Sequence, residues 1–445
     1  MLQKLSPGRT GIFNAVSGDD ATILPMATKR PSVLRRIAKS LGPGVITGAA
    51  DDDPSGVATY SIAGAQLGTS LLWTALFTWP LMAFVQMTCA RIGMVTGRGL
   101  AGSLRKKFPK PLLAAAAFAL FAANTLNIGA DLSGMADAAE MLTGGNSHVF
   151  VILFGVGITV AAVRLRYFQI ASVLKWLALA LGAYVATAFF THPRWGAVAR
   201  AALVPSFPRG KAAWATLVAI LGTTISPYLF FWQASQEVEE EKAMGRRMLV
   251  SRLGATSREI TDRRIDIGVG TFASNLVMFF IILTTAMTLH PHGITNIETS
   301  KQAAQALAPL AGKFAAALFT VGIVGVGLLA IPTLAGSSAY AFAETFGWMQ
   351  GLDRKLQGAR RFYVVMGTAV AIGIAMDFAD INPVRALFWS AVVNGLLAPF
   401  LLIGVLVVAG DRKLMEGQPS PRASRIVVGV TAALMIAAAI GMFVF

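Results

Sequence analysis

The chain has 445 residues, of which 55% are hydrophobic and 13% are charged, whereas soluble globular proteins carry about a quarter charged residues. Apolar runs long enough to cross a bilayer recur along the whole length, so we expect one helical bundle rather than several soluble domains. The net charge of +16 is gathered in short clusters between these runs, which excludes a nucleic-acid-binding protein.

The first forty residues are polar and basic, and we interpret residues 1–40 as a cytoplasmic tail without a cleavable signal peptide. An all-α integral membrane protein with eleven spans is predicted to follow. The expected spans are 41–66, 70–94, 111–135, 148–164, 167–190, 212–237, 265–289, 311–345, 362–378, 384–409 and 424–445.

The distribution of Lys and Arg predicts the orientation of these spans. With the N-terminus in the cytoplasm, the tail and the inward-facing loops hold 30 of the 38 basic residues. The positive-inside rule therefore predicts a multi-pass protein of the cytoplasmic membrane with its C-terminus outside. The basic outward loop at 192–211 is the exception.

Span one contains a charged interruption in the stretch GPGVITGAADDDPSGVATYS, residues 42–61. Three aspartates precede a helix-breaking triplet: Asp51, Asp52 and Asp53, then Pro54, Ser55 and Gly56. Unpaired charge is costly inside a membrane, and unwound backbone survives there only where it lines a cavity or is buried in protein. We therefore expect the helix to unwind here around a functional site.

Span six carries a second interruption at Pro227, within GTTISPYLFFWQASQEVEE, residues 222–240. Hydroxyl side chains precede the proline and an aromatic follows it: Thr223, Thr224, Ser226 and Tyr228. Two broken helices at matching positions of two five-helix halves indicate an inverted 5+5 repeat transporter that binds its substrate between the breaks. The predicted core, 41–410, comprises repeats 41–190 and 212–409, followed by an inner loop and an eleventh helix in 411–445.

At these residues the chain resembles the Nramp family of divalent metal transporters, over about residues 40–415. The resemblance rests on Asp53-Pro54-Ser55-Gly56, on ARIGMVTGRGLAGSLRKKF at 90–108, on GSSAYAFAETF at 336–346 and on Pro399-Phe400. It implies the LeuT-type fold of the sodium-coupled amino-acid symporters, with helices one and six unwound.

The departures from the family pattern concern the ion. Ser226 stands where the family has Met, Tyr228 where it has His, Gly56 where it has Asn, and Leu397 where it has Gln; in helix three the acidic pair becomes Asp131 and Gly134. Loss of the thioether leaves oxygen ligands, which suit Mg²⁺ and Mn²⁺. The pattern is most similar to the Nramp-related magnesium transporters.

The resemblance, together with the breaks, predicts a role for each candidate residue. Asp53 is the expected central ligand, supported by the backbone of Gly56 and Thr223 and by the hydroxyls of Thr224 and Ser226. Asp51, Asp52 and Asp131 are expected to form an acidic approach or a coupling path. The predicted function is import of Mg²⁺ or Mn²⁺ by alternating access. Uniport and proton-coupled transition-metal symport both stay open.

Three other classes of protein compete with this prediction. An organic-solute symporter of the same fold is disfavoured because three acids would repel a substrate carboxylate. An enzyme is disfavoured because no base–nucleophile pair is present and the single cysteine, Cys89, lies in an apolar run. A metal-gated channel stays open. Apart from the transported cation, no cofactor is expected, and beyond the lipid bilayer no obligate protein partner is evident.

Overall fold

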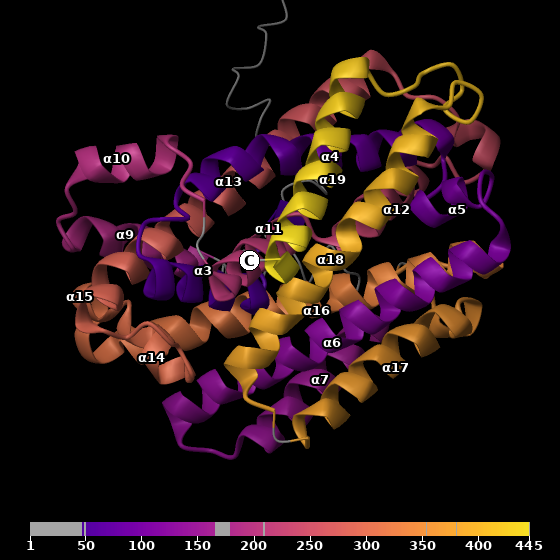
Figure 1. The fold of residues 1–445 in the computed structure, drawn as a ribbon. Helices are drawn as coiled ribbons and strands as arrows, with labels where there is room; N and C mark the ends of the chain where they lie inside the picture. Colours follow the sequence, from indigo (N-terminus) through magenta and orange to yellow (C-terminus); the bar gives the residue numbers. More distant parts are fainter. Residues whose placement is uncertain are drawn as a thin grey trace, which may run out of the picture. The chain divides into compact units, whose positions relative to one another are not determined.

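The computed structural model describes residues 47–48, 50–164, 179–207, 210–352, 354–379 and 381–444, and all of them belong to one unit, Ser40–Phe445. The predicted tail 1–40 and parts of spans one and five lie outside the described residues. The described residues form only helices and their connections, as Figure 1 shows. Eight described helical stretches are long and apolar enough to cross a membrane.

The first predicted interruption is a break in the helix. Residues 50 and 51 are helical, Asp52 and Asp53 are not, and α3 (Pro54–Leu67) begins directly afterwards. Proline is suited to the first position of a helix because its nitrogen has no hydrogen to leave unsatisfied. The second interruption has the same form, since α11 (Lys211–Thr224) ends before Ile225 and Ser226, and α12 (Pro227–Ala243) starts at a proline.

The remaining predicted spans are helices too. Their bounds are α4 (Trp73–Thr96), α6 (Lys110–Thr143), α7 (Ser147–Arg164), α9 (Gly182–Phe190), α13 (Ser257–Thr288), α16 (Ala315–Phe346), α17 (Arg360–Asp377), α18 (Pro383–Gly410) and α19 (Arg422–Val444). Short helices lie in the connections: α5 (Leu100–Leu104), α10 (Trp195–Leu203), α14 (Ser300–Gln305) and α15 (Ala308–Ala311), with 3₁₀ turns at Leu179–Leu181, Leu249–Arg252, His290–His292, Gly312–Phe314 and Leu356–Gly358.

Two boundaries differ clearly from the prediction. Helix α13 starts eight residues before the predicted residue 265, because Thr256 and Glu259 form a reciprocal capping box at its N-terminus. Helix α6 continues eight residues beyond the predicted residue 135 and ends where Gly144 adopts a φ of 72°. Helix α10 lies in the segment predicted as the outward loop 192–211.

Helix packing places the two breaks next to each other. Helix α3 packs against α13, α18 and α11, while α6 packs along α16, and Figure 1 shows α6 and α16 side by side. Helices α11 and α18 approach very closely at Gly222, where an added β-carbon would lie 2.1 Å from the carbonyl oxygen of Ala391. A glycine is required there because any side chain would separate the helices.

The phrases at 90–108 and 336–346 meet in space. The carboxylate of Glu344 on α16 accepts hydrogen bonds from the amides of Gly99 (2.9 Å) and Gly102 (2.8 Å) at the start of α5. A β-carbon at Gly99 would lie 2.1 Å from Glu344 Oε1, so only glycine admits this contact. Two stretches that are far apart in sequence therefore form one structural joint.

Candidate functional site

The carboxylate of Asp53 is held from two sides at the first break. Its Oδ1 accepts a hydrogen bond from the Gly56 amide (2.6 Å), so Asp53 is the N-cap of α3. Its Oδ2 accepts a hydrogen bond from Asn127 Nδ2 (2.9 Å) on α6. The residue is only 2% exposed. An acid held in this way has a fixed position and direction.

Asn127 also connects Asp53 to the second acid that the sequence singled out. The same Nδ2 lies 3.5 Å from Asp131 Oδ2, one turn further along α6. Asp131 is fully buried. The structure therefore brings Asp53 and Asp131 together through one amide group.

The second break meets the first at Thr223. A β-carbon added to Gly56 would lie 3.0 Å from Thr223 Oγ1, so the absence of a side chain at residue 56 is what lets this hydroxyl approach. Both residues are buried. Gly56 and Thr223, predicted as neighbours in one site, lie beside each other.

Two other predicted residues of span six, Ser226 and Thr224, make specific contacts. Ser226 Oγ donates to the carbonyl oxygens of Thr223 (2.6 Å) and Gly222 (2.9 Å), which satisfies the end of α11. Thr224 Oγ1 lies 3.2 Å from the hydroxyl of Tyr60 and 3.7 Å from Met278 Sδ. The hydroxyl oxygens of Ser226 and Thr224 keep lone pairs, and the contacts described here fix the direction in which these lone pairs point.

The other two aspartates of the first break share one partner. Ser274 Oγ on α13 lies 2.9 Å from Asp51 Oδ2 and 3.0 Å from Asp52 Oδ1. Both aspartates are buried, at 0% and 5% exposure, so in this conformation they do not line an open vestibule. Ser55 is tied to α18 through the carbonyl oxygen of Leu387 (2.7 Å) and Ser390 Oγ (2.9 Å).

Several buried oxygen atoms around the breaks have no hydrogen-bond partner among the described residues. They are Asp51 Oδ1, Asn127 Oδ1, Asp131 Oδ1 and Thr223 Oγ1. Buried polar atoms are nearly always satisfied, so such a group indicates a place for water or a cation. The described residues contain no group of three His, Cys, Asp or Glu side chains that could hold a metal ion. An ion here would need carbonyl, hydroxyl or amide oxygens as well.

Sequence reasoning missed three residues of this region: Asn127, Ser274 and Met278. Asn127 had a detectable signal, because it is a buried amide one turn before Asp131 on a helix already assigned to the site. Ser274 and Met278 had none, since only the packing of α13 on α3 places them beside the breaks.

Comparisons with known proteins identify the family of the chain. The family described as Natural resistance-associated macrophage protein-like, or Nramp, matches residues 44–445. A protein named divalent metal cation transporter MntH from Yersinia pestis is 27% identical over 439 residues, covering 92% of this chain and 97% of the relative. The protein of the same name from Pectobacterium carotovorum is 27% identical over 411 residues, with 87% and 90% covered.

Solved structures show the same fold. The Eremococcus coleocola manganese transporter superposes with a TM-score of 0.71 at 17% identity, covering 94% of this chain and 90% of that one. Mhp1, a nucleobase-cation-symport-1 family transporter, gives 0.53 at 14% identity, with 90% and 92% covered. The predicted LeuT-type inverted-repeat fold with helices one and six unwound is confirmed. With the family profile matched over nearly the whole chain, this multi-pass membrane protein belongs to the Nramp family.

Proposed function

We propose that the chain carries a divalent metal ion through the membrane and binds it between the two helix breaks, with Asp53 as the central ligand. The family consists of transporters, and the prediction that the chain is not an enzyme is confirmed. The observation that supports this site is a group of buried oxygen atoms near Asp53 that have no hydrogen-bond partner among the described residues. These oxygens come together because α3, α6 and α11 meet there.

Mn²⁺ is the ion we propose first. The relatives bear the names divalent metal cation transporter and manganese transporter, and Mn²⁺ accepts carboxylate, hydroxyl and carbonyl oxygens. Mg²⁺ is the second candidate. It is favoured by Ser226, which replaces a thioether with a hydroxyl, whereas the comparisons give no support to a magnesium branch.

The coupling ion is a separate part of the proposal. Asp53, Asn127 and Asp131 form a continuous polar chain from the first break into α6. Such a chain supports proton-coupled symport better than uniport. We propose that Asp131 accepts the coupled proton.

The topology also remains a proposal. We place the protein in the cytoplasmic membrane, with the N-terminus and the basic loops inside and the C-terminus outside, because the Lys and Arg residues concentrate in alternate loops. The repeats are proposed to be 41–190 and 212–409.

The test is metal uptake into proteoliposomes that contain the purified protein, a metal-sensitive dye and a pH dye. Mn²⁺, Mg²⁺ and Cd²⁺ are supplied in parallel under a negative-inside potential. Mn²⁺ entry with internal acidification supports both parts of the proposal. Mg²⁺ entry without acidification would contradict both parts and indicate Mg²⁺ transport without a coupled proton.

Two substitutions separate the binding role of Asp53 from its structural role. Asp53→Asn keeps the N-cap oxygen for the Gly56 amide but removes the charge and turns a second donor toward Asn127, so we expect no transport and a stability slightly below that of the wild type. Asp53→Ala also loses the cap and is expected to be less stable by about 1 kcal/mol. Normal uptake by Asp53→Asn would exclude Asp53 as the central ligand.

A further inference from the structure

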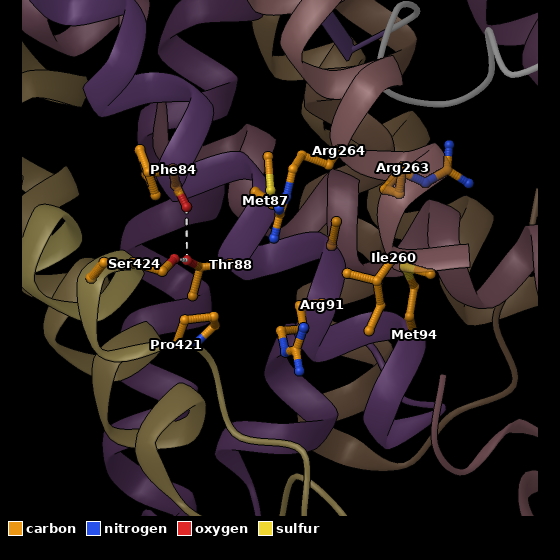
Figure 2. A pocket seen from close by; sticks show the side chains of 12 residues that line it. Phe84, Met87, Thr88, Arg91, Met94, Ile260, Arg263, Arg264, Pro421 and Ser424 are labelled. Carbon is orange, nitrogen blue, oxygen red and sulfur yellow. Dashed lines mark hydrogen bonds between the residues drawn. The ribbon is translucent and has the colours of Figure 1, made fainter. Parts of the chain in front are cut away.

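A cavity of about 270 Å³ lies away from the helix breaks, between α4 and the first turns of α13 and α19 (Figure 2). Much of its wall is apolar and includes Phe84, Met87, Met94 and Ile260. Beside it, Thr88 Oγ1 and Ser424 Oγ lie 2.9 Å apart and join α4 to α19. The cavity therefore lies on helices long and apolar enough to cross the membrane.

Three arginines line this cavity, and one of them is fully engaged elsewhere. Arg263 donates to Glu237 (2.8 Å), to Asp266 (2.5 Å) and to Glu240. Figure 2 shows its guanidinium group pointing away from Arg91 and Arg264. Arg263 therefore holds α12 to α13 and contributes no free charge to the cavity.

The other two arginines have no carboxylate partner among the described residues. Arg91 is half-buried, and its Nε donates to the carbonyl oxygen of Gln418 (3.2 Å). Arg264 is exposed, and its positive charge acts on that of Arg91. Among the described residues, those that line the cavity include no Asp or Glu. Two like charges beside one cavity repel each other unless an anion lies between them.

We propose that this cavity binds an anionic phospholipid, with the headgroup phosphate at Arg91 and Arg264 and the upper part of an acyl chain along Phe84 and Met87. A free phosphate would satisfy the arginines but leave the apolar wall without a partner. An anionic lipid supplies a phosphate for the two arginines and an acyl chain for the apolar wall. Basic pockets between membrane helices are known sites for anionic headgroups. The proposed orientation places this site in the cytoplasmic leaflet, and that placement rests on the proposed function; the lipid site itself does not depend on the transported ion.

The experiment measures lipid retention by native mass spectrometry on the full chain, with phosphatidylglycerol and phosphatidylcholine added separately. We expect retention of phosphatidylglycerol only, and a loss of affinity of roughly tenfold in the double variant Arg91→Gln/Arg264→Gln. The double variant Arg91→Lys/Arg264→Lys should keep most of the binding. Arg264→Glu changes one exposed residue, so it reports on binding even where the double variant fails to fold.

The matched control is Arg258→Gln/Arg412→Gln, which removes two exposed arginines outside the cavity. This control should bind phosphatidylglycerol as the wild type does. Equal losses in the control and the cavity variant would mean attraction to overall charge and would overturn the proposal. Unchanged binding in Arg264→Glu and in the double variant would do the same. Displacement of the lipid by inorganic phosphate alone would identify a free-anion site instead.

Discussion

The hydroxyl of Tyr228 donates a hydrogen bond to the carbonyl oxygen of Ala50 across 3.0 Å, and this bond joins the helix after the second break to the segment before the first. Both residues are fully buried. The two broken helices are thus fastened to each other at the point where they change direction. In alternating access, such a contact favours whichever conformation contains it.

Tyr228→Phe removes this bond and leaves the ring in place. We expect the conformation described here to lose about 1 kcal/mol and uptake to change several-fold, because a buried carbonyl loses its partner. Uptake and melting temperature of the same preparation measure the two effects. Tyr363→Phe is the control, since its hydroxyl bonds to the carbonyls of Leu352 and Arg354, away from the breaks. It should lower stability without changing uptake.

Asn127→Leu tests the amide between the two acids. We expect metal uptake to lose affinity by roughly tenfold, because hydrogen bonds to charged groups contribute about 1.5–3 kcal/mol. The concentration dependence of Mn²⁺ uptake measures it. Asn124→Leu, one turn earlier on α6, removes bonds to Ser337, Ser338 and Leu334 on α16 and should affect stability but not affinity. Equal affinity loss in both variants would mean that Asn127 acts only through packing.

Ser226→Met restores the sulfur that the family resemblance leads one to expect. We expect preference to shift toward Cd²⁺ relative to Mg²⁺ by about tenfold, since thioethers bind soft ions. Competition between the two ions in the uptake assay measures the shift. Ser226→Leu adds similar bulk without sulfur, so it accounts for the cost of overpacking a buried site. A shift of equal size in Ser226→Leu would show that volume, not sulfur, sets the preference.

Met278→Leu tests whether α13 already supplies a sulfur near the second break. Met278 Sδ lies 3.7 Å from Thr224 Oγ1 and the residue is fully buried. We expect Cd²⁺ uptake to weaken and Mn²⁺ uptake to stay near the wild type, because leucine conserves the volume at a cost below about 1.5 kcal/mol. Unchanged Cd²⁺ uptake would place Met278 outside the site.

Gly99→Ala tests the joint between α5 and α16. The new β-carbon would collide with the Glu344 carboxylate, so we expect a loss of about 1–3 kcal/mol in a thermal unfolding measurement. Gly367→Ala on α17 is the matched control, because its β-carbon meets no atom within 4 Å. It should leave the protein equally stable or more stable, since alanine favours helix over glycine. An equal loss of stability in the control would show that the effect of Gly99→Ala does not come from this joint.

The sequence was most informative where the side-chain chemistry and the backbone constraints of neighbouring residues indicated the same structure. Asp53 beside Pro54 predicted the first break because a charge and a missing amide both disfavour a continuous membrane helix. At Pro227 the missing amide alone located the second break. The fold followed from the spacing of the two breaks, and the comparisons confirm it.

The details of the site depended on contacts that no local pattern encodes. Gly134, considered as a missing acid, packs against Leu387, and an added β-carbon would lie 2.8 Å from Leu387 Cδ1, so a side chain here would have to displace that leucine. Ser274 reaches Asp51 and Asp52 only because α13 packs along α3. Such neighbours are fixed by tertiary packing, which one sequence does not reveal.

The two hydrogen bonds that the Asp53 carboxylate accepts link the folding of α3 to the binding of the ion. In the proposed site, the Asp53 oxygen that accepts a hydrogen bond from the Gly56 amide, in the first turn of α3, is also one that an arriving cation would share. Order in the first helical turn and occupancy by the ion are then thermodynamically linked, and each weakens the other by the same factor. Under the proposed function, this linkage would lower the affinity for the ion and so favour its release on the far side of the membrane.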